Sequence, residues 1–208
     1  MPLLLRREEA DCLWAVWRMD EPLAEVEQAL SCTPWVAEAQ RRFQSLTRRH
    51  EWLTARWLLH TLTARYPEIS YLPTGRPCLA DGSCQLSISH TKGYVALILS
   101  PRRVGIDIER IARRVERVAP RFLRDDEQPM PYQGELLHSQ LLHWSAKETL
   151  FKCIDAEGVD LRDHLRIHPF QPQARGTFQA EEYRTERHQQ FEVCYELHPD
   201  FVLTYTVV

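Results

Sequence analysis

Short runs of alternating apolar and polar residues predict β-strands in two parts of the chain. The clearest run is VGIDIE at residues 104–109, where one face carries valine and isoleucine and the other carries glycine and two carboxylates. Residues 85–89 alternate in the same way, and residues 94–99 form a continuous apolar run. The strands that we expect from these patterns span residues 13–17, 85–89, 94–99, 104–109, 165–167, 176–183, 191–197 and 201–208.

Other segments show helical spacing of apolar residues. In residues 51–66, Leu53, Trp57 and Leu58 form an apolar stripe, and Pro67 is expected to end that helix. The remaining helical segments are a helix at residues 34–46 that begins at Pro34, a broken helix at residues 115–127, and the longest helix at residues 135–153.

Helices packed on antiparallel sheets correspond to the α+β class. Pro101, Arg102 and Arg103 form a short link between two expected strands, which predicts an antiparallel hairpin. The order strand, helices, strands occurs twice, so we expect two similar halves at residues 1–102 and 103–208. The halves share no visible sequence identity, and this expectation depends on the pattern alone.

Composition narrows the function classes. The formal net charge of −3 gives no global field that would favour nucleic acid, but Arg and Lys are frequent in residues 41–117, which favours a local site for an anion. None of the six cysteines forms a C-x-x-C pair, which speaks against a zinc site. The sequence has no run of 18 apolar residues and no recognisable signal peptide, so we expect a cytoplasmic protein that does not span a membrane.

Three carboxylates and a lysine form the most informative group. Asp107 and Glu109 leave the same face of one expected strand, and Glu148 and Lys152 lie four apart on one helix face. Together they would suit a hard divalent cation beside a phosphate ester. Taken separately, each pair has an ordinary alternative: the solvent face of a strand, and an ion pair on a helix surface.

Two further pieces fit an anion site. The strand at residues 85–89 leads into Ser89, His90 and Thr91, followed by a lysine and a glycine, which is a composition typical of phosphate binding. Arg76 lies between a glycine and a proline in a loop, where it could clamp a phosphate. A lone histidine or loop arginine is more often structural or simply exposed.

Taken in order, these pieces resemble the 4′-phosphopantetheinyl transferases of the longer single-chain type. The matching segments are Gly75-Arg76-Pro77, Ile88-Ser89-His90-Thr91, Gly105-Ile106-Asp107-Ile108-Glu109, Arg121-Phe122-Leu123 with Glu127, and Trp144-Ser145-Ala146-Lys147-Glu148-Thr149-Leu150-Phe151-Lys152. Two positions depart from the family pattern: Thr91 stands where serine is common, and Thr149, which we expect to pack, stands where alanine is frequent.

The resemblance implies a pseudo-dimer of two α/β halves with the active site in the cleft between them. It also implies transfer of the 4′-phosphopantetheine arm of coenzyme A to a serine of an apo acyl or peptidyl carrier protein, with release of adenosine 3′,5′-bisphosphate. The first half would bind the nucleotide, and the second would hold the metal and the catalytic helix. A monomer is expected, and the carrier could belong to lipid or secondary metabolite biosynthesis.

The same resemblance implies a role for each residue. Asp107, Glu109 and Glu148 would hold Mg²⁺, Glu148 would also be the base, and Lys152 would stabilise the leaving phosphate. The nucleotide end of coenzyme A would contact Arg56, Arg76, Ser89 and His90. Candidate contacts to an acidic carrier are Arg113, Arg114 and Arg117.

Two other functions use the same residues. A different Mg²⁺-dependent enzyme that cleaves phosphodiesters would need the carboxylates but no carrier. A protein that only binds carriers would need neither the metal nor coenzyme A.

Overall fold

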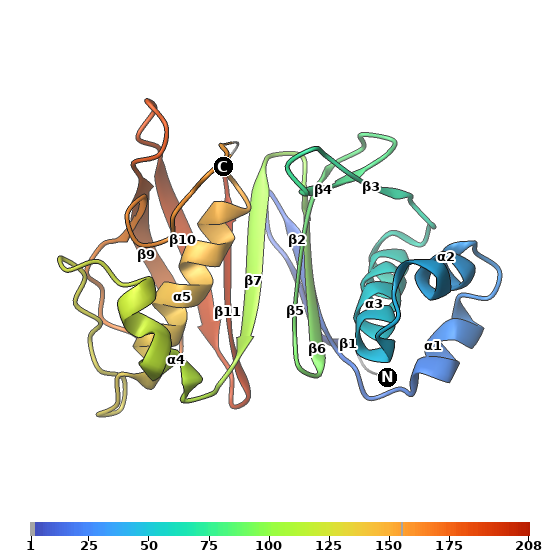
Figure 1. Ribbon diagram of the computed structural model, residues 1–208, viewed down its shortest axis with the longest axis horizontal. Coiled ribbons are helices and arrows are strands. Elements are labelled where there is room, and N and C mark those ends of the chain that lie inside the picture. The colour runs from blue at the N-terminus through green and yellow to red at the C-terminus, as the bar shows by residue number, and fades with distance from the viewer. Residues whose placement is uncertain (1–2, 155) are drawn as a thin grey trace.

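The computed structural model describes residues 3–154 and 156–208, which fold into two larger antiparallel sheets covered by helices (Figure 1). The first sheet has the order β1-β2-β6-β5, and the second has the order β7-β11-β10-β9-β8. The first contains β1 (Leu3–Glu8), β2 (Leu13–Arg18), β6 (Tyr94–Ser100) and β5 (Gln85–Thr91). The second contains β7 (Val104–Arg110), β11 (Phe201–Val207), β10 (Gln190–Leu197), β9 (Arg175–Glu182) and β8 (Leu165–Ile167).

Five α-helices and a small two-stranded sheet complete the fold. The helices are α1 (Leu23–Ala29), α2 (Trp35–Arg42), α3 (Leu46–Thr63), α4 (Arg114–Val118) and α5 (Leu137–Phe151), and the small sheet pairs β3 (Ile69–Tyr71) with β4 (Pro77–Leu79). The α+β class is therefore confirmed. No helix of the described residues is both long and apolar enough to cross a membrane.

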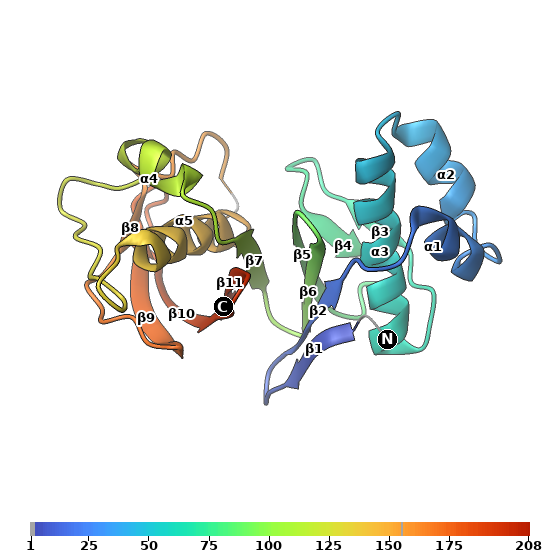
Figure 2. The same cartoon turned by 90° about the horizontal axis from the view of Figure 1, so that it is seen from below.

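The two larger sheets lie face to face, as Figure 2 shows from below. Apolar side chains from both sheets fill the layer between them. On the outer face of the first sheet, Leu58 and Leu59 of α3 pack against the strands. On the outer face of the second sheet, Leu142, Ala146 and Leu150 of α5 do the same. The order of layers is helix, sheet, sheet, helix, so each sheet has one face toward the other sheet and one face toward a helix.

The longest helix is α3 and not α5, contrary to the sequence-based expectation. It begins five residues earlier than expected because the Ser45 hydroxyl accepts a hydrogen bond from the Arg48 amide at 3.4 Å and so caps the helix. The expected helix at residues 34–46 ends at Arg42 for the same reason, since Phe43 and Ser45 are extended. The sequence patterns also missed β1, α1, β3 and β4.

The expected hairpin across residues 101–103 is wrong. Strand β6 pairs with β2 on one edge and β5 on the other, so it has no edge left for β7. The short link instead carries the chain from the first sheet to the second, where β7 pairs with β11.

Strands β5 and β7 lie side by side although they share no backbone ladder. The hydroxyls of Ser87, Ser89 and Thr91 accept hydrogen bonds from backbone amides of β7, at 3.2, 3.3 and 3.3 Å. The donors are the amides of residues 106, 108 and 110. We call this row of three bonds the hydroxyl ladder. It joins an edge strand of one sheet to an edge strand of the other.

Gly105 allows β7 and α5 to approach closely. A Cβ atom at this position would lie 2.3 Å from the Thr149 carbonyl oxygen and 2.8 Å from the Cys153 Sγ. Because the first of these is backbone, no side-chain rotation relieves the overlap. We expect Gly105→Ala to lower the free energy of unfolding by about 1–3 kcal/mol, measured by urea denaturation. A variant as stable as the wild type would contradict this close packing.

Candidate active site

A cavity of about 430 Å³ lies where the first sheet and its helices meet the end of α5. Its wall includes Arg48 and Trp52 from α3, His90 from β5, and Phe151 and Lys152 from α5 and the residue after it. The Gly75-Arg76-Pro77 loop forms another part of the wall. Segments from both parts of the sequence are therefore needed to enclose this space.

The cavity wall is strongly cationic. Among the described residues it carries Arg42, Arg48, Arg56, Arg76 and Lys152, against the one carboxylate of Glu51. A wall of this charge favours an anionic ligand, because closely spaced cations repel one another until an anion lies between them.

His90 lies in this wall, where its ring contacts one positively charged and one negatively charged side chain. Its Nε2 is 2.9 Å from Arg48 Nη1, and its Nδ1 is 3.5 Å from Glu51 Oε2. Because a guanidinium can only donate, Nε2 accepts and the proton lies on Nδ1. Burial lowers the pKa of His90, and Arg48 and Lys152 act in the same direction against Glu51. The imidazole is therefore neutral near pH 7.

Arg56 lies at the floor of the cavity, where it is 2% exposed. Its guanidinium carbon lies 3.1 Å from the ring centroid of Trp52, and its Nη1 donates to the Trp52 carbonyl at 3.3 Å. Burial lowers its pKa to about 10, so it remains charged at pH 7. Its Nε is buried and has no hydrogen-bond partner in the described part of the chain, which leaves a donor for a ligand.

The carboxylate of Asp107 is 4% exposed and lies beside the cavity. Its Oδ1 accepts hydrogen bonds from Ser89 Oγ at 2.8 Å and from Lys152 Nζ at 2.9 Å. Lys152 Nζ also donates to the Ile106 carbonyl at 2.7 Å, which fixes the lysine against β7. The other oxygen, Oδ2, is buried and has no hydrogen-bond partner among the described residues. Oδ1 of Asp107 therefore accepts two hydrogen bonds from side chains, whereas Oδ2 can still bind a ligand.

Glu109 and Glu148 lie close enough to Asp107 to be affected by its charge. Burial raises the pKa of Glu109 to about 7, and repulsion by Asp107 and Glu148 adds to this effect. The Trp144 indole, which donates to Glu109 Oε1 at 2.7 Å, opposes it. Burial and the charge of Asp107 also raise the pKa of Glu148, while Lys152 lowers it. The four residues predicted as a group therefore occupy one neighbourhood.

The donor set suits a hard divalent cation. Carboxylate oxygens are the ligands that Mg²⁺ prefers, and a cation would relieve both the unpartnered Asp107 Oδ2 and the mutual repulsion of the three carboxylates. As the side chains stand within residues 3–154 and 156–208, no three His, Cys, Asp or Glu groups already form a metal-binding cluster. Lys152 is the cation that Asp107 contacts in this arrangement.

The raised pKa of Glu109 has a measurable consequence in the absence of metal. The folded protein holds a proton on Glu109 up to about pH 7, whereas an unfolded chain releases it near pH 4.5, the ordinary pKa of a glutamate. Folding stability from this group therefore falls as pH rises between these values. The side chain introduced by Glu109→Gln stays neutral at every pH. We therefore expect the free energy of unfolding of this variant to increase relative to that of the wild type between pH 5 and pH 8.

This pH dependence is measured by thermal unfolding in EDTA, with both proteins at each pH. A difference between Glu109→Gln and wild type that does not change with pH would contradict the raised pKa.

Other residues of the family-like segments have structural positions. Lys147 does not face the carboxylates but is fully buried on the other side of α5, where its Nζ donates to the Phe122 carbonyl at 2.6 Å and to Glu127 Oε2 at 2.7 Å. Thr149 packs as expected: it is buried, and its hydroxyl lies 2.7 Å from that of Thr204.

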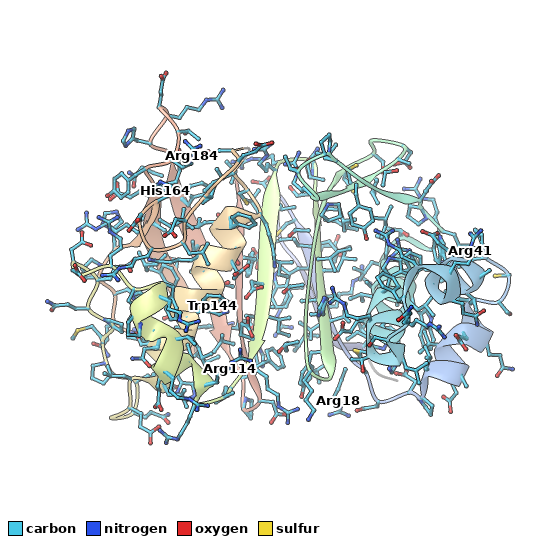
Figure 3. The ribbon with its side chains drawn as sticks, in the orientation of Figure 1. Arg18, Arg41, Arg114, Trp144, His164 and Arg184 are labelled. Atoms are coloured by element: carbon cyan, nitrogen blue, oxygen red, sulfur yellow. The ribbon has the colours of Figure 1, made fainter. Side chains whose placement is uncertain are left out.

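The structure also gives positions for the residues that were expected to contact the nucleotide or the carrier. Ser89 is buried against Asp107 and does not belong to the described cavity wall, whereas His90, Arg56 and Arg76 do. The guanidinium groups of Arg113, Arg114 and Arg117 lie on the exposed side of α4 and the residue before it. Figure 3 shows Arg114 on α4 and Trp144 on α5, both in the part of the molecule built from β7 to β11.

Sequence reasoning missed Arg48 and Glu51, which contact His90 from α3. Their spacing of three residues on a helix was a visible signal, because it places both side chains on one face. It also missed the role of Glu127, whose carboxylate joins Lys147 to the backbone of β8 through the Ile167 amide at 2.7 Å.

No curated protein matches the chain at a significant level. A family model, in contrast, does match. The family model for the 4′-phosphopantetheinyl transferase superfamily matches residues 103–206, half of the 208-residue chain and the part that carries the three carboxylates, Trp144 and Lys152. The chain belongs to the 4′-phosphopantetheinyl transferase superfamily.

Proposed function

We propose that this protein transfers the 4′-phosphopantetheine arm of coenzyme A to a serine of an apo acyl or peptidyl carrier protein. The observation that supports this most directly is the junction at Lys152. Its ammonium lines the cationic cavity and at the same time contacts Asp107 of the carboxylate group. A ligand with a phosphate-rich end in the cavity would place its reacting phosphate beside the carboxylates.

Coenzyme A has the properties that the cavity requires. Its nucleotide carries a 3′-phosphate and a pyrophosphate, which suit the arginines and His90, and an adenine ring, which suits the aromatic side chains of Phe43, Trp52 and Tyr71. We assign Arg56, Arg76 and His90 to this end of the molecule. Residues 1–102 would then supply the nucleotide side and residues 103–208 the metal side of a pseudo-dimeric enzyme.

The metal would be Mg²⁺, held by Asp107, Glu109 and Glu148. When bound, the ion would supply charge neutralisation at the pyrophosphate and its leaving group. The unpartnered Oδ2 of Asp107 and the raised pKa values of the two glutamates support this assignment.

The chain's own groups provide the remaining chemistry. Glu148, whose pKa is raised, would accept the proton of the carrier serine as the serine oxygen forms its bond to phosphorus. The bond between that phosphorus and the bridging oxygen of the pyrophosphate breaks, and adenosine 3′,5′-bisphosphate leaves with the electron pair. Lys152 would stabilise the charge on the departing phosphate. Its position against Ile106 and Asp107 holds it at the junction where that charge develops.

The carrier protein would approach from the side of α4. Arg113, Arg114 and Arg117 are exposed there, and Arg113 forms ion pairs with Glu116 at 3.0 Å and Glu135 at 3.3 Å. These partners are themselves exposed, so an acidic carrier helix could replace them at little cost.

The function is tested by mass spectrometry. The protein is incubated with coenzyme A, Mg²⁺ and a panel of apo carriers from fatty acid, polyketide and peptide systems, and the carriers are examined for the added arm. We expect a mass gain on at least one carrier. No gain across the panel would overturn the proposal, and cleavage of coenzyme A without a carrier would favour a phosphodiester-cleaving enzyme. Carrier binding that survives Asp107→Ala, with neither reaction, would favour a non-catalytic binding protein.

His90→Ala tests the assignment of the cavity. Arg48 and Glu51 already form an ion pair at 3.3 Å, and the imidazole of His90 contacts both of them in the cavity wall. Removing the imidazole takes away the group that holds the Arg48 guanidinium in the wall beside the ligand. We expect the affinity for coenzyme A, measured by calorimetry in EDTA, to fall by about tenfold. The maximal rate at saturating coenzyme A should change much less. An unchanged affinity would contradict the nucleotide role of His90.

A further inference from the structure

Ser89 differs from the other members of the hydroxyl ladder in having a second partner. All three hydroxyls accept a backbone amide of β7. Only Ser89 is also hydrogen-bonded to a carboxylate in the described residues, since its Oγ donates to Asp107 Oδ1 at 2.8 Å. The period of two along β5 therefore brings this one hydroxyl to the metal-site carboxylate.

The hydrogen-bonding capacity of Ser89 is used within the protein. A hydroxyl has one hydrogen to donate, and here it is directed at Asp107. One of its lone pairs accepts the Ile108 amide at 3.3 Å. The side chain is 7% exposed and is absent from the described cavity wall, to which its neighbours Ser87 and His90 belong. To donate to a nucleotide phosphate, Ser89 would have to release Asp107.

The two hydrogen bonds on Asp107 Oδ1 fix the orientation of the carboxylate. Lys152 comes from the end of α5 and Ser89 from β5, so the oxygen is held from two separate elements. The planar carboxylate then has one orientation, in which Oδ2 is buried and unpartnered. If Lys152 moves to a departing phosphate, Ser89 is the contact that remains on Oδ1.

We propose that Ser89 is a positioning residue that holds Asp107 Oδ1 so that Oδ2 is presented to the divalent cation. This inference rests on the proposed function. It differs from a role in nucleotide binding, which the sequence resemblance implied for Ser89. It also links the first sheet to the metal site, because Ser89 belongs to β5 while all three metal-site carboxylates come from β7 and α5.

The test measures metal binding directly. The full-length wild type and variants are titrated with Mn²⁺ in the presence of excess coenzyme A and without carrier. Free Mn²⁺ is followed by electron paramagnetic resonance, with a coenzyme A blank subtracted. Coenzyme A affinity is measured separately by calorimetry in EDTA. The variants are Ser89→Ala, Ser89→Thr, which keeps the hydroxyl, and Thr91→Val as the matched control. Thr91 belongs to the same hydroxyl ladder, accepts the Arg110 amide of the same strand at 3.3 Å, and lies outside the described cavity wall.

We expect Ser89→Ala to weaken Mn²⁺ binding by about tenfold or more, as is usual when the partner of a metal ligand is removed. Coenzyme A affinity in EDTA should stay unchanged. Ser89→Thr should restore metal binding, and Thr91→Val should bind Mn²⁺ as the wild type does. If Ser89→Ala does not fold, Ser89→Cys, whose thiol is a weak donor, replaces it with the same expectation.

Three results would overturn the proposal. Mn²⁺ affinity that is unchanged in Ser89→Ala would show that Asp107 needs no such support. A fall in coenzyme A affinity in EDTA, without an effect on Mn²⁺, would return Ser89 to the nucleotide site. An equal loss of Mn²⁺ binding in Thr91→Val would assign the effect to the sheet junction as a whole. Failure of the wild type itself to bind Mn²⁺ is a separate outcome, because it overturns the metal assignment on which the proposal depends.

Discussion

Asp107→Asn is expected to lower the rate of carrier modification by about 10³-fold while leaving the protein folded. The amide has the shape of the carboxylate, and its oxygen can still accept from Ser89 and Lys152. It has no charge, however, so it neither neutralises Lys152 nor provides a strong ligand for Mg²⁺. The rate is measured by the mass gain of an apo carrier over time, with folding checked by circular dichroism.

Asp200→Asn provides the matched control for this result. Asp200 also accepts a hydrogen bond across the two sheets, from the Tyr94 hydroxyl at 2.9 Å, but it lies in the link between β10 and β11 and outside the candidate active site. We expect Asp200→Asn to keep its activity. If Asp107→Asn retained a near-normal rate, the assignment of Asp107 to the metal would be wrong.

Lys147→Met should have the largest effect on stability. The ammonium of Lys147 and the carboxylate of Glu127 form an ion pair at 2.7 Å, and neither side chain is exposed to solvent. Removing one partner leaves a buried charge without compensation, which costs about 3–5 kcal/mol. We expect urea denaturation of Lys147→Met to show a loss of this size. Burial already lowers the pKa of Lys147, which is consistent with its low solvation.

The double variant Lys147→Met, Glu127→Gln separates the pair from its surroundings. We expect its loss of unfolding free energy to be smaller than the sum of the losses in the two single variants, because neither charge is left unpaired. As a surface comparison, Arg18→Ala removes an exposed pair with Asp20 and should cost less than about 1 kcal/mol. A cost of that small size for Lys147→Met would contradict the structural role of the buried pair.

Elements with strong local patterns were predicted well from the sequence. The four C-terminal strands β8 to β11 lie within two residues of the expected positions, because each has alternating or continuous apolar residues bounded by polar links. Helix α5 was also expected, although the expected range of 135–153 is two residues longer at each end than the helix itself. The break between α2 and α3 was expected at residues 47–50 but lies at residues 43–45. Phe43 and Leu46 continue the apolar spacing, and the cap at Ser45 marks the actual boundary.

Properties that depend on distant parts of the chain were not predictable. The 101–103 link was read as a hairpin because the partners of β6 are set by β2, more than 70 residues earlier in the sequence. Likewise, local spacing on β7 and α5 indicated Asp107, Glu109, Glu148 and Lys152. The contact between Ser89 and Asp107 depends on how two sheets meet, which no local pattern encodes.

The apolar layer between the two sheets limits how the protein can be divided. The segment matched by the family model begins at residue 103, at the start of the second sheet. A fragment cut there would expose Ile106, Leu203 and Tyr205 to water, although all three are buried against the first sheet in the intact chain. Such a fragment would have a large exposed apolar surface on its β-sheet, which favours aggregation during expression. The two sheets therefore form one inseparable unit for recombinant production.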